Sequence, residues 1–170
     1  MKDSIDRRRD IVRGQIMEAI SDPENIAALT PLLAEFQGLM RAHGLALARK
    51  WMKSKKPMIA SAGWCTYSAI LATWDDEDLD LDEVAALLDQ VVQEVHSAPN
   101  RVRYAMNNFV ISVGTYITPL LKKAKQAAKK IGPVSVDMGD TACKVPLAVD
   151  YIAKVESMKR VGKKRKTAKC

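Results

Sequence analysis

The chain has few of the residues that break helices or cross-link secreted domains. Its 170 residues include 8 glycines, 7 prolines and 3 cysteines, and aromatic residues make up only 5%. Alternating runs of β-branched residues bounded by turn residues are nearly absent, which argues against a sheet-based fold. Alanine, lysine and leucine are among the most frequent residues, and all three favour helices. The composition therefore predicts an all-α protein.

Other absences restrict the cellular setting. Cys65, Cys143 and Cys170 are an odd number at irregular spacings, so they define neither a disulfide framework nor a zinc site. The N-terminal stretch MKDSIDRRRDIV is charged where a secretory signal needs an apolar run. No run of about 18 apolar residues is present that could cross a membrane. We therefore expect a cytoplasmic protein that does not bind membranes.

Helical periodicity divides the chain into short helices separated by turns. Apolar residues at helical spacing predict helices over residues 3–21, 24–40, 45–52, 57–74, 82–97, 101–116, 119–131 and 147–158. Pro57 suits the first turn of its helix, and the small residues 60–63 admit a close neighbour. Asp80 and Glu83 have the spacing of a capping box.

The turns between these helices predict how the helices stack. The connection at residues 98–100 is so short that its two flanking helices must run antiparallel. The helices that start near Pro57 and Asn100 begin about 43 residues apart, which matches the period of a two-helix HEAT-type repeat. We therefore predict HEAT-like antiparallel helix pairs stacked in a curved solenoid, an α-α superhelix.

The predicted domain organisation has a single helical-repeat domain and a tail. The domain covers residues 1–159, with N-terminal helices over 1–44 and HEAT-type helices over 45–159. Residues 160–170 form a basic segment that we expect to be flexible.

The net charge of +7 is unevenly distributed along the chain. Residues 75–94 carry nine acidic and no basic side chains, whereas residues 95–170 carry sixteen basic and four acidic ones. We interpret the acidic run as helix capping and solubility. The cationic last third indicates a polyanionic partner, although a solvated lysine-rich surface would have the same composition.

The predicted helix over residues 101–116 carries polar side chains of the kind that contact nucleic acid. Its apolar residues share one face, which leaves the sides and back to Arg101, Arg103, Tyr104, Asn107 and Asn108. Arginine and asparagine donate to phosphate oxygens, and tyrosine offers a stacking surface. Two structural alternatives remain open: an asparagine that satisfies a neighbouring helix end, and a tyrosine that packs between repeats.

Further cations lie on the following helix and in the tail. Lys122 belongs to a lysine-rich stretch of the helix over 119–131, and the tail contributes Lys163, Lys164, Arg165 and Lys166. Such cations bind a phosphate backbone without reading its sequence. Together with the polar residues of the helix over 101–116, they form the predicted DNA-binding set.

Residues 132–146 contain three groups that could bind a metal or act in catalysis. Asp137, Asp140 and Cys143 follow one another at three-residue spacing, but no histidine lies near them. We interpret this stretch as a structured loop whose polar groups hold the last helix, and we predict no metal or cofactor. His43 and His96 lie at predicted helix ends, where they can meet terminal carbonyls.

Several long segments resemble a known family. ARKWMKSKKPMIASAGW, HSAPNRVRYAMNNFVISVGTY, VDMGDTACKVPLAVDYI and GKKRKTAKC are similar to the DNA alkylation repair enzymes, the HEAT-like-repeat alkylpurine DNA glycosylases and their relatives. The similarity runs from about Leu45 to Cys170. It implies a helical solenoid whose basic concave face holds double-stranded DNA, and in active members it implies excision of N3- or N7-alkylated purines.

The same resemblance assigns no catalytic residue to this chain. Asn108 occupies the position where active members carry a tryptophan, and residues 60–62 carry no charge where an arginine is expected. The leading hypothesis is therefore a DNA alkylation repair protein that binds duplex DNA. The alternatives are a non-catalytic scaffold for nucleic acid or an acidic protein, and an enzyme that uses Asp137, Asp140 or Cys143.

Overall fold

The structure, a computed structural model, describes residues 2–21, 35, 41–140 and 144–167. It divides into two compact units, residues 1–47 and residues 48–170. The first unit contains helix α1 (Lys2–Ser21), in agreement with the prediction for residues 3–21. The predicted helix over 24–40 lies outside the described residues except at Glu35, and residues 41–52 are helical.

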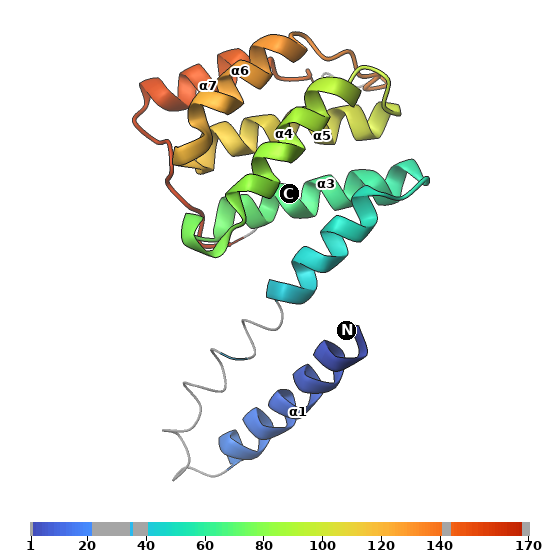
Figure 1. Cartoon of the computed structure of the whole chain (residues 1–170), viewed down its shortest axis with the longest axis vertical. Coiled ribbons are helices and arrows are strands. Elements are labelled where there is room, and N and C mark those ends of the chain that lie inside the picture. Colours follow the sequence, from blue (N-terminus) through green and yellow to red (C-terminus); the bar gives the residue numbers. More distant parts are fainter. Residues whose placement is uncertain (1, 22–34, 36–40, 141–143, 168–170) are drawn as a thin grey trace. The chain divides into compact units, whose positions relative to one another are not determined.

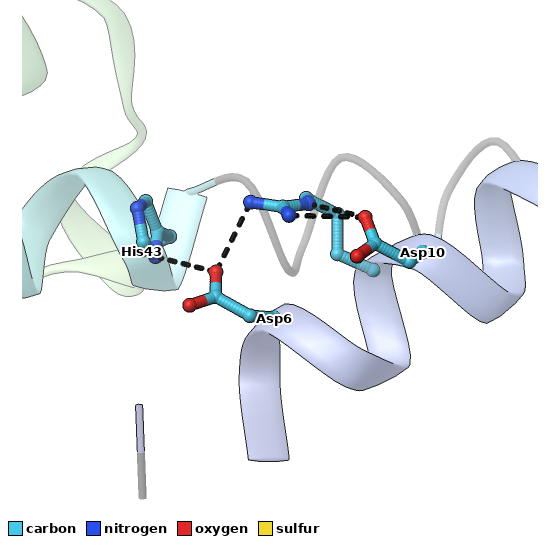
Figure 2. Close-up of polar contacts among 4 residues, drawn as sticks. Asp6, Asp10 and His43 are labelled. Carbon is cyan, nitrogen blue, oxygen red and sulfur yellow. Dashed lines mark hydrogen bonds and ion pairs between the residues drawn. The ribbon is translucent and has the colours of Figure 1, made fainter. Parts of the chain in front are cut away.

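Polar contacts in the first unit connect α1 to the start of the helix over 41–52 (Figure 2). Arg9 lies between two carboxylates, with Nη1 3.0 Å from Asp6 Oδ1 and Nη2 3.0 Å from Asp10 Oδ1. His43 was expected to meet a helix carbonyl, but its Nδ1 lies 3.7 Å from Asp6 Oδ1. These groups are partly exposed, so each pair stabilises the unit by at most about 1 kcal/mol.

The second unit is built from helices alone over its described residues (Figure 1). They are α3 (Pro57–Thr73), η2 (Asp76–Asp78), α4 (Leu81–Glu94), α5 (Asn100–Tyr116), η3 (Thr118–Leu120), α6 (Leu121–Ile131) and α7 (Ala148–Ser157). In one layer α5 packs between α3 and α7, and in the other α4 packs on α6. The prediction of an all-helical protein is confirmed, and the two layers are those of stacked helix pairs.

The core of this unit surrounds α5. Trp64 and Tyr67 of α3 meet Phe109 of α5 edge to face, with ring centroids 5.1 and 5.8 Å from that of Phe109. All three side chains are almost fully buried. Such aromatic pairs add about 0.5–1.5 kcal/mol beyond the burial of their area, so this cluster fixes α3 against α5.

Two glycines allow helices to approach closely. A Cβ at Gly63 of α3 would lie within 2.4 Å of the Met52 backbone nitrogen, so the end of the helix over 41–52 rests directly on the small-residue patch. A Cβ at Gly114 of α5 would lie 2.6 Å from Ile152 Cδ1 of α7. The close approach predicted for residues 60–63 is therefore present.

The start of α4 shows half of the predicted capping box. Asp80 Oδ1 accepts a hydrogen bond from the Glu83 backbone N–H at 3.0 Å, as an N-cap should. The Glu83 carboxylate does not turn back to the cap. It accepts hydrogen bonds from Arg49 Nε and Nη2 at 2.7 and 2.6 Å and from the Tyr67 hydroxyl at 2.7 Å. Glu83 thus connects α4 to α3 and to the helix over 41–52.

Candidate nucleic-acid interface

A basic groove lies where the chain leaves α7. The C-terminal segment (residues 158–167) crosses from the end of α7 past the end of α5 to the end of α3 (Figure 1). Between this segment and α7 lies a groove of about 900 Å³, which we call the tail groove. None of its described lining residues is acidic, and six are cations: Lys154, Arg160, Lys163, Lys164, Arg165 and Lys166.

The position of the C-terminal segment follows from the chemistry of helix ends. The last carbonyls of a helix have no partner within the helix, and the helix dipole makes that end negative. Gly162 donates its backbone N–H to the Thr115 carbonyl of α5 at 2.9 Å, and Arg165 donates its own to the Ala72 carbonyl of α3 at 2.7 Å. Lys164 Nζ donates to the Leu71 carbonyl at 3.1 Å. The segment therefore caps two helices at once.

This arrangement differs from the flexible tail expected at residues 160–170. Over residues 160–167 the segment is attached to α3 and α5 by the backbone and side-chain hydrogen bonds just given. The sequence did not reveal them, because the acceptors are helix-end carbonyls far away in the sequence. Residues 168–170 lie outside the described part of the chain.

One cation of the predicted set is used within the fold. Lys164 Nζ lies 2.7 Å from Asp76 Oδ1 of η2, and the Lys164 side chain is only 17% exposed. Its charge is thus neutralised by the protein, and its hydrogen bond to Leu71 holds it in place. Lys164 fixes the C-terminal segment, whereas its neighbours Lys163 and Lys166 are exposed at the tail groove.

Aromatic and apolar side chains lie among the exposed cations of the groove. The Arg165 guanidinium carbon lies 5.4 Å from the centre of the Tyr116 ring, a cation–π contact that covers this ring. On α7, Tyr151, Lys154 and Met158 line the groove at helical spacing. Tyr151 and Met158 are 43% and 52% exposed. Cationic and aromatic side chains therefore share one surface.

The first half of α5 holds a loop. The Asn100 side chain exchanges two hydrogen bonds with the Asp137 backbone, both 2.7 Å long. Arg103 Nη1 donates to the Ser135 carbonyl at 2.9 Å. Asn107 Nδ2 donates to the Pro146 carbonyl at 2.9 Å, immediately before α7. These contacts anchor Ser135, Asp137 and Pro146, the last of which lies just before the last helix.

The placement expected for Asn107 is wrong. We expected its side chain to point away from the core, but the residue is 1% exposed. Its amide donates a hydrogen bond to the Pro146 carbonyl, just before α7. This is the structural alternative that the spacing left open. Asn107 contributes to the fold and is not available at the surface, so we remove it from the DNA-binding set.

The other predicted residues do not converge on the groove. Arg101 is exposed, whereas Tyr104 and Asn108 are half-buried. They lie in the first half of α5, roughly 12–22 Å along its axis from Tyr116 at 1.5 Å per residue. Lys122 lies on α6, where it lines a second, smaller hollow with Lys125, Lys129 and Glu156. DNA contacts by these residues stay predictions.

The groove also contains residues that the sequence reading missed. They are Tyr116, Tyr151, Lys154, Met158 and Arg160. A signal was present: Tyr151, Lys154 and Met158 follow at intervals of three and four, which places them on one face of the last helix. That face directly precedes the basic run, so it was a candidate to pack beside it.

Hydrogen bonds hold the part of the loop around Asp137. Asp137 Oδ1 accepts from the Gly139 N–H at 2.9 Å, and the Asp137 backbone is held by Asn100. Asp140 is exposed, and Cys143 lies outside the described residues.

Over the described ranges, no three histidine, cysteine or acidic residues lie together as metal ligands would. No helix in these ranges is long and apolar enough to span a membrane. His96 meets a terminal carbonyl as expected, at 2.8 Å from Ile131 O of α6.

A polar cluster of Arg49, Tyr67 and Glu83, of which only Tyr67 is buried, joins α3, α4 and the helix over 41–52. Burial raises the pKa of the Tyr67 hydroxyl, and its hydrogen bond to Glu83 raises it further. Burial also acts to raise the pKa of Glu83, but the hydrogen bonds from Arg49 and Tyr67 outweigh it and lower this pKa. The hydrogen bond to Glu83 raises the pKa of Arg49. Glu83 and Arg49 therefore stay charged and act as a structural ion pair.

Comparison with known proteins relates the chain to helical-repeat proteins. No model of a known protein family matches it. It is 39% identical over 117 residues to the uncharacterized protein Lin0241 of Listeria innocua and 38% identical over 117 residues to the uncharacterized protein Lmo0209 of Listeria monocytogenes. These matches cover 69% of this chain and 49% of each relative, so the chain spans about half the length of the curated relatives it matches.

A solved structure gives the fold. That structure represents a new family of proteins related to the HEAT-like repeat DNA glycosylases with affinity for branched DNA structures. The two chains superpose with a TM-score of 0.68 at 32% identity, over 74% of this chain and 54% of the other. The chain therefore has a HEAT-like repeat helical fold, and it is similar to a protein related to the HEAT-like repeat DNA glycosylases.

Proposed function

We propose that the chain binds DNA in the tail groove and prefers branched DNA to an intact duplex. The observation that carries the proposal is the lining of the groove, which contains six cations and no acidic side chain among the described residues. Five of the six are free of an ion pair with any described residue, Lys164 being the exception. Closely spaced unpaired cations favour a polyanion.

The preference for branched DNA rests on the similarity to the solved structure whose family has that affinity. The groove is consistent with it, because the groove lies at one end of the helix layer, beside the ends of α3 and α5, where an arm leaving a junction could be held. The family resemblance by itself favours double-stranded DNA, and the experiment below separates the two.

The proposal is binding without excision of alkylated bases. The transition state for excision of a cationic purine carries positive charge on the sugar, which a carboxylate would stabilise. In the tail groove the substrate and this transition state would both face like charges, which repel them. The groove chemistry thus fits phosphate binding better than glycosidic hydrolysis.

The test measures the affinity of the full chain for fluorescent DNA of one sequence in three forms: a four-way junction, a fork and a blunt duplex. We expect the junction and the fork to bind most tightly. The double variant Lys163→Gln/Lys166→Gln should bind all three more weakly. Lys53→Gln/Lys55→Gln removes two exposed charges before α3, away from the groove, and should bind as the wild type does.

Tightest binding to the blunt duplex would refute the preference for branched DNA, and two further results would overturn binding in the groove. The first is equal weakening by the groove variant and by the control variant, because binding would then depend on total charge alone. The second is a lack of binding to any of the three DNAs, which would favour the scaffold for an acidic protein. Alkylated duplex DNA is incubated in parallel, and release of 7-methylguanine would show that the excision argument is wrong.

A further inference from the structure

We propose that the tail groove accepts unpaired nucleotides and that Tyr151 stacks on one of their bases. This inference rests on the proposed DNA binding and names the part of a branched DNA that the groove recognises. The observation behind it is an exposed aromatic and apolar strip inside a cationic groove, where a surface for phosphate alone would need only charge.

Helix α7 has two faces with different purposes. Ala148 and Ile152 are buried against the neighbouring helices and account for its packing. Tyr151 and Met158 point to the other side, where they line the groove at 43% and 52% exposure. Lys154 lies between them on the same face. Packing of the fold therefore does not explain the aromatic ring at position 151.

The two tyrosines of the groove are not equivalent. Tyr116 is 8% exposed, and the Arg165 guanidinium covers its ring at 5.4 Å. Its face is already occupied, so Tyr116 acts as a platform that holds Arg165. Tyr151 retains an accessible ring, which is the group that an unpaired base can stack on.

The surroundings of Tyr151 fit a nucleotide better than other partners. Stacking binds a base, while Lys154 and Arg160 line the same groove, where they would contact phosphates of the strand. In a paired duplex the base faces are covered by their neighbours, so Tyr151 would find no face to stack on. The volume of about 900 Å³ is within the range of about 300–1,000 Å³ typical of sites for small ligands, so it has room for a few nucleotides.

The experiment compares three DNAs that differ only in one arm. The first is a fork with a normal single-stranded arm, the second carries abasic sites throughout that arm, and the third is the blunt duplex without the arm. The abasic arm keeps every phosphate and removes every base. Affinities of the wild type, Tyr151→Ala and Tyr151→Phe are measured by fluorescence anisotropy at fixed salt, and circular dichroism confirms that each variant is folded.

We expect the wild type to bind the normal fork roughly ten-fold more tightly than the abasic fork, which is the effect of one stacked base. Tyr151→Ala should lose that difference and leave the affinities for the abasic fork and the duplex unchanged. Tyr151→Phe should keep it, because the ring is retained without the hydroxyl.

Each other outcome has a distinct meaning. Equal affinity of the wild type for normal and abasic arms would refute stacking while leaving the proposed DNA binding intact. Equal loss by Tyr151→Ala on both arms would refute it as well, since the ring would then act on the backbone or on the fold. If none of the three DNAs binds, the proposed function fails and this inference fails with it.

Discussion

The salt dependence of DNA binding is the sharpest test of which lysines contact phosphate. Each phosphate neutralised by a protein cation releases condensed counterions, so the logarithm of the affinity falls linearly with the logarithm of the salt concentration. The slope is about −0.9 per contact on duplex DNA and about −0.7 on single strands. The structure sets an upper limit on the number of contacts.

Six cations line the tail groove, but Lys164 is neutralised by Asp76 at 2.7 Å, so at most five contribute. Five contacts correspond to a slope of about −4.5 on duplex DNA and a loss of affinity of about 500-fold between 50 and 200 mM salt. Lys163→Gln/Lys166→Gln leaves three contacts, a slope of about −2.7 and a loss of about 40-fold over the same range.

Lys164→Gln provides the matched control for the single variant Lys163→Gln, because it removes the same charge from the neighbouring position. It should leave the slope nearly unchanged and lower the temperature of unfolding, since it deprives Asp76 and the Leu71 carbonyl of their partner. Titrations of a fluorescent duplex and fork at four or more salt concentrations give the slopes. If Lys164→Gln flattens the slope as much as Lys163→Gln does, the assignment of structural and phosphate-binding lysines is refuted.

Three further predictions concern the fold that supports the groove. Gly63→Ala should destabilise the protein by about 1–3 kcal/mol, because the added Cβ would meet the Met52 backbone. Gly14→Ala is the control, because Gly14 has open space around it and the variant should not be destabilised. Chemical denaturation measures both. Asn107→Ala should lower the free energy of unfolding by about 1–3 kcal/mol, because it leaves the Pro146 carbonyl without its hydrogen bond. At low temperature, where the variant is folded, it should bind DNA like the wild type. Reduced affinity would show that Asn107 belongs to the DNA interface after all. Because the pKa of Glu83 is lowered in the fold, its stabilising effect is present above the ordinary glutamate pKa of about 4.3 and is lost as the pH falls below it. Glu83→Gln should therefore flatten this part of a plot of the free energy of unfolding against pH. An unchanged plot would contradict the structural role of the hydrogen bonds to Glu83.

The sequence predicted the helices well because their signals are local. The apolar period, Pro57 at the start of α3 and Asp80 at the cap of α4 each depend on residues within a few positions. The predicted closeness at Gly63 also depended on a short run of small residues. Each of these features could be read without knowledge of which helices would meet.

The site was harder to predict because exposure depends on distant chain segments. Asn107 sits beside the apolar face of its helix and was expected outside, yet the loop that it holds begins 25 residues later at Gly132. The basic tail was read as charge alone, whereas its partners are carbonyls at the ends of α3 and α5. Whether a polar side chain is free for a ligand or used by the fold requires the tertiary structure.

The capping of two helix ends explains how a run of like charges can form an ordered surface. Adjacent lysines and arginines repel one another and normally favour an extended, mobile chain. Here the carbonyls at the negative ends of α3 and α5 hold Gly162, Lys164 and Arg165, and Asp76 cancels the charge of Lys164. Exposed cations of the segment, among them Lys163 and Lys166, are thereby fixed beside α7 before a ligand arrives. Less conformational entropy would then be lost in the proposed binding, so the groove would hold a nucleic-acid strand more tightly than the same residues on a free tail.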